Sequence, residues 1–268
     1  MKIHAGFSLA YDCVQPTPML LVLNIHPSRR VDLLTDQTLY FDRPLEAWAY
    51  TDSFGNACTR IVAPPGRTTI TTQFDIYDSG LPDIVAWDAV QHDIQHLPDE
   101  VLVYLLGSRY CDTDRLGDLA WSLFAHTPPG WARVQAICDW THNHIAFNYQ
   151  NANSQRTAYG GYIDRTGVCR DFAHLAITLC RCMNIPARYC TGYLGDIGIP
   201  PVRYPMDFSA WFEVYLSGRW YTFDARHNTP RIGRILMATG RDATDVALST
   251  SFGPSILSQF EVVTDEVV

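Results

Sequence analysis

The sequence lacks the features that mark several large classes of protein. Its 268 residues contain no apolar run near the roughly 20 residues that a membrane helix needs, so we expect no membrane partner. The first residues lack the long apolar stretch of a signal peptide, which favours a cytoplasmic protein. The formal net charge of -8 argues against nucleic acid as a partner, because phosphate binding needs a basic surface.

The eight cysteines lack the spacing of a structural zinc site, since no CxxC pair occurs. An even number of cysteines indicates disulfides mainly in short secreted chains, and this chain is long. Most of them stand in apolar surroundings, where a free thiol acts as a small hydrophobe. We therefore expect free cysteines, nearly all without a chemical role.

The composition that remains is globular, with 47% hydrophobic and 18% charged residues. Residues 1 to about 85 alternate in polarity between turn signals, which predicts β structure and a small sandwich. The strands expected there cover residues 19–25, 45–50, 58–62 and 68–74, the middle two as a hairpin.

The pattern changes after a connector at about 85–110. Helical spacing appears at residues 116–125 and 130–147, and a polar, glycine-containing loop is expected at 148–166. This change predicts two domains, a β-rich one at 1–90 and an α+β one at 91–268.

Residues 167–183 hold the most informative segment, Gly-Val-Cys-Arg-Asp-Phe-Ala-His and the apolar run after it. Gly167 suits a tight turn, and Cys169 then begins a helix, where unpaired N–H groups and the helix dipole favour a thiolate. His174 lies about 140° around the helix from Cys169, too far to act as its base. We interpret His174 as a buried structural residue.

The segments that follow predict strands beside this helix. A strand is expected at 187–193, a loop at 195–205, and a hairpin whose arms meet at a two-residue Ser-Gly turn. Pairing Leu216 with Arg219 places Trp211 opposite Asp224, with Ser209 on the same face, diagonal to Asp224.

These segments resemble the bacterial transglutaminase-like family, which shares a papain-type catalytic layout. The resemblance begins weakly at residue 108 and is carried by residues 167–175, 184–189, 192–193, 210–215 and 223–224. It implies an α+β fold in which a β-sandwich-like N-terminal domain precedes a transglutaminase/papain-like core. In that core a cysteine-bearing helix packs on an antiparallel sheet.

The resemblance also implies a Cys–His–Asp triad. Cys169 and Asp224 match its first and last members, while Ser209 occupies the position of the histidine. A serine hydroxyl cannot accept a proton at neutral pH as an imidazole does. His227, three residues beyond Asp224, is the alternative base if the chain turns back there.

The resemblance further implies a substrate cleft, flanked by Trp211, Tyr193 and Tyr162. It implies no metal and no organic cofactor, and no acidic calcium loop is recognisable. His142 and His144 fall at a predicted helix end and are interpreted as polar helix-terminal residues.

Three functional hypotheses remain at this level. The first is a cysteine peptidase, amidase or acyl-transfer enzyme that acts on amide bonds of a peptide or protein. The second is a catalytically degenerate member that binds peptide or protein in the same cleft. The third gives Cys169 a purely structural role in a helix. The sequence does not distinguish hydrolysis from acyl transfer, and it does not predict an oligomeric state.

Overall fold

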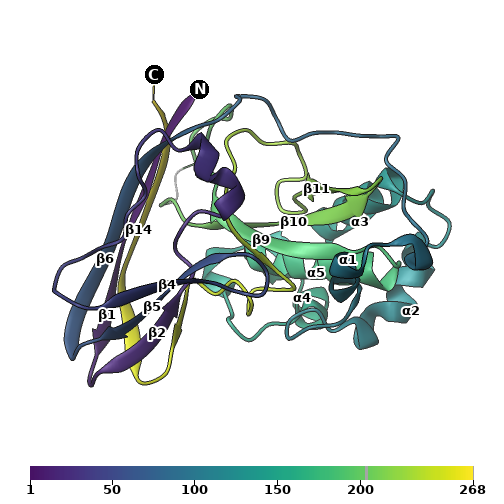
Figure 1. The fold of residues 1–268 in the computed structure, drawn as a ribbon. Coiled ribbons are helices and arrows are strands. Elements are labelled where there is room, and N and C mark those ends of the chain that lie inside the picture. Colours follow the sequence, from purple (N-terminus) through teal and green to yellow (C-terminus); the bar gives the residue numbers. More distant parts are fainter. Residues whose placement is uncertain (203–204, 268) are drawn as a thin grey trace.

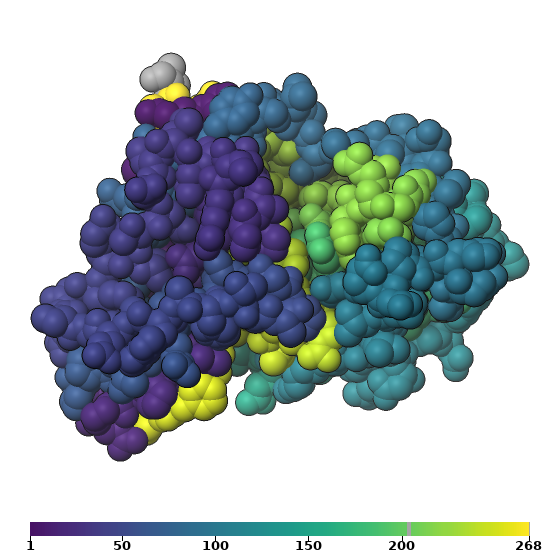
Figure 2. Space-filling model, viewed as in Figure 1, coloured from purple at the N-terminus to yellow at the C-terminus, as the bar shows by residue number. Residues whose placement is uncertain are grey.

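The computed structural model describes residues 1–202 and 205–267, and Figure 1 shows two parts packed side by side. N-terminal strands form a β-sandwich, and helices with a second set of strands form an α+β core. The expected architecture, a sandwich followed by an α+β core, is therefore confirmed. In Figure 2 these parts occupy opposite ends of the molecule, with green and yellow C-terminal segments visible between them.

The sandwich consists of two four-stranded antiparallel sheets. The first has the order β14 (Ser255–Val267), β1 (Lys2–Cys13), β6 (Gly66–Tyr77) and β3 (Tyr40–Phe41). The second has the order β13 (Ser249–Ser251), β2 (Thr17–Leu21), β5 (Ala57–Ala63) and β4 (Ala47–Thr51). The hairpin expected at 45–50 and 58–62 is β4–β5, while β2 ends four residues before the expected strand end at residue 25.

The two sheets share one buried apolar cluster, because side chains alternate along each strand. From β1, every second residue from Ile3 to Tyr11 enters this cluster, and β2 and β5 contribute Met19, Leu21 and Ile61. Tyr193, from the core, belongs to the same cluster. The sandwich and the core are therefore packed through a shared apolar interior.

The last strands of the chain return to the sandwich. β14 pairs with β1 from Lys2–Val267 to Cys13–Ser255, with one register shift, and β13 pairs with β2. The division expected from the sequence, 1–90 and 91–268, therefore leaves out strands that complete the first domain's sheets.

The core is built on a four-stranded antiparallel sheet with helices packed against one face. The sheet order is β11 (Arg219–Phe223), β10 (Ser209–Leu216), β9 (Ala187–Tyr193) and β12 (Ile235–Gly240). The central helix α5 (Cys169–Cys182) contacts β9 and β10, and three helices contact α5: α2 (Thr113–Phe124), α3 (Trp131–His144) and α4 (Ala158–Asp164).

Short elements connect these layers. They are the helix α1 (Asp99–Leu102), the 3-10 helices η1 (Pro27–Asp32), η2 (Ile94–His96), η3 (Val103–Leu105) and η4 (Tyr149–Asn151), and the parallel pair β7 (Ala146–Phe147) and β8 (Thr166–Gly167). The segment 148–166, expected to be a loop, thus contains η4 and α4. The loop expected at 195–205 is present, although residues 203–204 lie outside the described part. Among the described residues, no helix combines the length and apolar character needed to cross a bilayer.

The β10–β11 hairpin has the register expected from its two-residue turn. Leu216 pairs with Arg219 and Phe212 with Phe223, and Ser217 and Gly218 both have positive φ, at 46° and 78°. Such a turn matches the right-handed twist of the strands. Pairing ends at Phe223, so the next residue begins the loop that carries the candidate site.

Candidate functional site

The start of α5 is fixed by a buried carboxylate. Asp171 Oδ2 accepts the backbone N–H of Val168 at 2.8 Å and lies 3.3 Å from Arg156 Nη1. A Cβ atom at Gly167 would overlap this carboxylate. Glycine is therefore required here by close approach, whereas the sequence suggested a tight turn. The consequence is a fixed position for the first residue of the helix.

Cys169 is that first residue, and it is half-buried. Burial raises the pKa of its thiol to about 11; the Arg226 guanidinium and a hydrogen bond from the Ala210 backbone N–H act against this rise, while the Asp207 carboxylate adds to it. The thiol is therefore protonated at neutral pH. Burial therefore opposes the thiolate that the helix N-terminus was expected to favour.

Asp224 directly follows β11 and carries a dense set of hydrogen bonds. Its Oδ2 accepts from Arg234 Nη2 at 3.0 Å and from His227 Nδ1 at 2.8 Å. Its Oδ1 accepts the backbone N–H groups of Arg226 and His227, each at 3.0 Å. Burial alone would raise the pKa of Asp224, but the Arg234 charge and the His227 hydrogen bond hold it well below its usual range. Asp224 is therefore an anion at neutral pH.

His227 turns back onto Asp224 because the strand has already ended. Because Asp224 is an anion, Nδ1 donates to it, and in the neutral imidazole Nε2 then carries the lone pair. Among the described residues, Nε2 has no hydrogen-bond partner, and 22% of the side chain is exposed. This is the arrangement that a general base requires.

A cavity of about 170 Å³ lies beside these groups, and we call it the cleft cavity. Ser209 and His227 both line it, so the structure brings together the expected histidine position and the alternative base. Cys169 is not among its described lining residues, but Asp207 and Arg226, whose charges act on the thiol, are. The full lining is Tyr149, Leu194, Gly195, Asp196, Ile199, Val202, Pro205, Met206, Asp207, Phe208, Ser209, Arg226, His227 and Arg231.

The aromatic residues expected to flank the cleft are not among the described residues that line the cleft cavity. Trp211 is 2% exposed and supports the Arg234 guanidinium at 5.0 Å from its ring, while Tyr193 is fully buried. Tyr162 is half-buried and stacks on His144. The placement of Trp211 and Tyr193 gives no support to a role in substrate contact, because tertiary packing encloses both rings.

The other histidines near the site have structural surroundings. His174 is fully buried, stacks on Tyr110 at 5.0 Å, and its Nε2 accepts the backbone N–H of Ala243. His142 Nδ1 donates to backbone carbonyls of the loop after β11, and His144 Nε2 lies 2.8 Å from the carbonyl of Tyr162. The interpretation of His174 as a buried structural residue is confirmed.

Sequence reasoning missed three charged residues of the site. Arg234 forms an ion pair with Asp224, and the charges of Asp207 and Arg226 shift the pKa of the Cys169 thiol. Asp207 had a signal, since it stands two residues before Ser209 in the hairpin motif, whereas the arginines follow no periodic pattern. Across the described ranges, no group of three or more histidine, cysteine, aspartate or glutamate side chains is arranged to hold a metal ion.

Comparisons with known proteins identify the family of the domain that carries these residues. A family model described as the transglutaminase-like superfamily matches residues 119–225, which contain Cys169, Ser209 and Asp224. A solved structure of a cysteine protease candidate from Cytophaga hutchinsonii superposes with a TM-score of 0.83. That protein is 30% identical, and the alignment covers 99% of this chain and 90% of the other.

A further relative matches less of the chain, and a further solved structure matches it less closely. An uncharacterized protein of Mycobacterium leprae is 37% identical over 84 residues, a match that spans 30% of each chain. The periplasmic domain of TgpA from Pseudomonas aeruginosa is 15% identical, with a TM-score of 0.42 over 84% of this chain and 90% of that one. The matched domain and the full-length similarity at 30% identity together show that this chain belongs to the transglutaminase-like superfamily.

Proposed function

We propose that the protein is a cysteine peptidase, amidase or acyl-transfer enzyme, with Cys169 as nucleophile and His227 as base. The observation that carries this proposal is the 2.8 Å contact between His227 Nδ1 and Asp224 Oδ2, with His227 in the wall of the cleft cavity. An imidazole oriented by a carboxylate is the pair that activates a thiol. The substrates proposed are amide bonds of a peptide or protein.

The protonated thiol determines how the first step proceeds. Cys169 attacks the amide carbonyl as its proton passes to His227 Nε2, so that no standing thiolate is needed. The new sulfur–carbon bond leaves a negative charge on the carbonyl oxygen. The Cys169 backbone N–H, in the first turn of α5, is placed to stabilise this oxyanion.

The second half of the reaction returns the proton. The carbon–nitrogen bond breaks as His227 Nε2–H protonates the departing amine, which leaves a thioester on Cys169. Water then releases the acid, or a second amine takes the acyl group, with His227 accepting the proton of either. Throughout, the Asp224 anion stabilises the imidazolium, since its own pKa stays well below neutral.

A second candidate function is peptide or protein binding without catalysis. It is favoured by one observation: among the described residues, no histidine ring donates to or accepts from the Cys169 sulfur. With Ser209 at the expected histidine position and the thiol protonated, the cleft would then serve recognition only.

Turnover of a panel of fluorogenic peptide amides separates these functions. We expect wild-type hydrolysis that Cys169→Ala abolishes and that His227→Gln reduces by about 10²-fold to 10⁴-fold, the usual contribution of a general base. His126→Gln, at an exposed position away from the cleft, is the matched control and should leave the rate unchanged. Activity that survives in Cys169→Ala would refute the enzyme proposal. Absence of turnover, with peptide binding retained in Cys169→Ala, would support the second function instead.

A further inference from the structure

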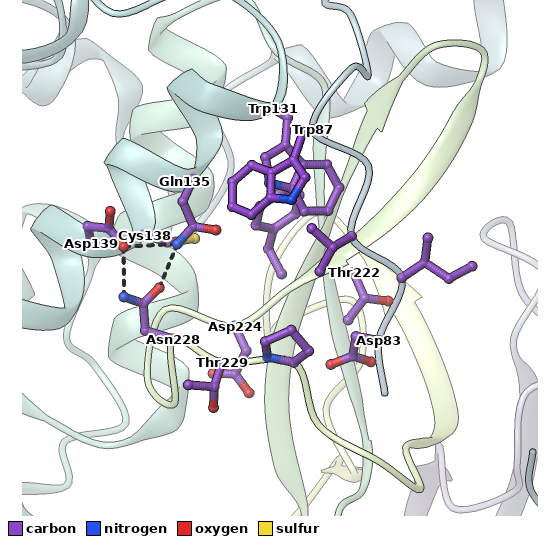
Figure 3. A pocket seen from close by; sticks show the side chains of 14 residues that line it. Asp83, Trp87, Trp131, Gln135, Cys138, Asp139, Thr222, Asp224, Asn228 and Thr229 are labelled. Carbon is purple, nitrogen blue, oxygen red and sulfur yellow. Dashed lines mark hydrogen bonds between the residues drawn. The ribbon is translucent and has the colours of Figure 1, made fainter. Parts of the chain in front are cut away.

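A second cavity of about 300 Å³ lies between α3, the connector before α1, and the loop after β11 (Figure 3). We call it the tryptophan cavity, because Trp87 and Trp131 form one wall. Its full lining is Asp83, Ile84, Val85, Trp87, Trp131, Gln135, Cys138, Asp139, Thr222, Phe223, Asp224, Asn228, Thr229 and Pro230. Its volume is at the small end of the range for ligand pockets, which suits a small molecule.

One of the two indole rings in the apolar wall is exposed to solvent. The rings of Trp87 and Trp131 meet at 6.1 Å and 63°, so they present two indole surfaces at an angle. Trp131 is buried in the core, but Trp87 remains 73% exposed at the edge of the cavity. A large aromatic side chain left in water beside a cavity indicates a surface that gains from being covered.

The polar rim opposite this wall offers acceptors without a partner, together with one free N–H of Asn228 among the described residues. Gln135 Nε2 donates to Asp139 Oδ1 at 2.9 Å and to Asn228 Oδ1 at 3.0 Å, and Asn228 Nδ2 donates to Asp139 Oδ1 at 2.8 Å, as the dashed lines in Figure 3 show. Both N–H groups of Gln135 are thereby used. Among the described residues, Asp139 Oδ2 and Gln135 Oε1 have no partner, so this rim is matched by a ligand that donates hydrogen bonds.

The charge of the lining also favours a ligand that donates hydrogen bonds. It includes three carboxylates and no lysine, arginine or histidine. Two of these carboxylates, Asp83 and Asp224, are paired with the Arg234 guanidinium. Asp139 is exposed and, within the part of the chain that the structure describes, forms no ion pair. One negative charge at the rim is therefore left for a ligand.

We propose that the tryptophan cavity binds a small organic ammonium ion that carries an aromatic group. The apolar part would fill the space beside Phe223 and Trp131, and the ammonium would donate to Asp139 while lying against the Trp87 ring. This inference does not rest on the proposed chemistry of Cys169. The two sites are nevertheless neighbours, because Arg226 and His227 line the cleft cavity while Asn228 and Thr229, next in the same loop, line this one.

Titration with phenethylamine, followed by calorimetry and by quenching of tryptophan fluorescence, tests the proposal. We expect saturable binding of phenethylamine and much weaker binding of 2-phenylethanol, which has the same shape but no charge. Asp139→Asn should weaken phenethylamine about fivefold, the factor expected for one exposed ion pair, and leave 2-phenylethanol unchanged. Trp87→Ala should weaken both probes.

The matched control is Trp121→Ala, which removes another exposed indole, from α2, outside the lining. It should leave the affinity of phenethylamine unchanged. Equal binding of the amine and the alcohol would overturn the proposal, as would full amine affinity in Asp139→Asn. Failure of phenethylamine to bind the wild-type protein at millimolar concentration would also overturn it.

Discussion

Two histidines of this protein have opposite surroundings. His174 lies on α5, five residues from Cys169 in sequence; it is fully buried between aromatic rings, and burial lowers its pKa to about 3. His227 lies on the loop after β11; it is 22% exposed, bonded to Asp224 through Nδ1, and open at Nε2. The histidine nearer in sequence to the nucleophile is thus structural, and the distant one has the geometry of a base.

The difference shows what a rigid helix and a loop can each provide. A helix fixes the direction of every side chain, so a residue on the wrong face cannot reach the first turn. A loop that follows a strand can reverse within three residues and bring a ring back to the carboxylate before it. The following experiments test whether the two histidines differ in function as they differ in environment.

The largest expected effect comes from placing a histidine at residue 209. Ser209→His would place an imidazole at the position that the resemblance assigns to the base, on the wall that His227 also lines. In a protein that also carries His227→Gln, we expect Ser209→His to raise amidase activity by about 10²-fold to 10⁴-fold, because it restores acid–base help from a strand position. Steady-state kinetics on peptide amides measures this. A rate no higher than that of His227→Gln alone would show that residue 209 cannot supply the base.

The next effect concerns the thiol itself. With a pKa of about 11, Cys169 should react with iodoacetamide about two orders of magnitude more slowly than free cysteine at mildly alkaline pH, because little thiolate is present. Mass spectrometry of a tryptic digest, taken over a pH series, gives the rate at this residue. Alkylation that reaches its plateau near neutral pH would show an activated thiolate and contradict the neutral thiol.

The buried histidine predicts a loss of stability in mild acid. The folded protein keeps His174 neutral down to about pH 3, whereas the unfolded chain binds a proton below 6.5. The unfolded state therefore binds more protons in this window, and stability, complete above 6.5, falls as the pH decreases. We expect the loss per pH unit to grow toward about 1.4 kcal/mol as the pH falls from 6.5 to about 5, where most carboxylates stay ionised. Urea unfolding at several pH values measures the slope, and His174→Gln should remove it.

The smallest expected effect is the change in the free energy of unfolding at neutral pH when either histidine is replaced. His174→Gln should lower the free energy of unfolding by about 2 kcal/mol, since a fully packed ring is lost. His227→Gln should cost less than about 1 kcal/mol, because the side chain is partly exposed and an amide can still donate to Asp224. Equal losses, measured by urea unfolding, would remove the distinction drawn between the two sites.

The parts of the fold that could be predicted from sequence are those with local signals. The strand at 187–193 and the β10–β11 register were predicted because proline and a Ser-Gly turn define them within a few residues. β1 was missed because much of it is buried on both faces, so its sequence lacks clean alternation. β14 pairs with a strand about 250 residues away, and nothing near it in sequence indicates that partner.

The candidate site likewise contains some features that local sequence signals predict and others that they do not. The position of Cys169 follows from a predicted helix start, and that of Asp224 from the register of the hairpin and from the family resemblance. The pKa of the thiol cannot be predicted in this way, because it depends on how deeply the folded chain buries the sulfur and on charges from distant segments. The return of His227 to Asp224 depends on β11 stopping at Phe223, and strand ends are uncertain by more than that single residue.

The pairing of Lys2 with Val267 has a consequence for how the protein is made. During synthesis β1 leaves the ribosome early, yet one of its two neighbours emerges only after the whole core has been translated. The nascent chain therefore carries an unpaired strand edge while the whole core is translated, when pairing with another chain is the main hazard. Closure of this sheet has to wait for β14, and until then the sandwich remains open along one edge of β1.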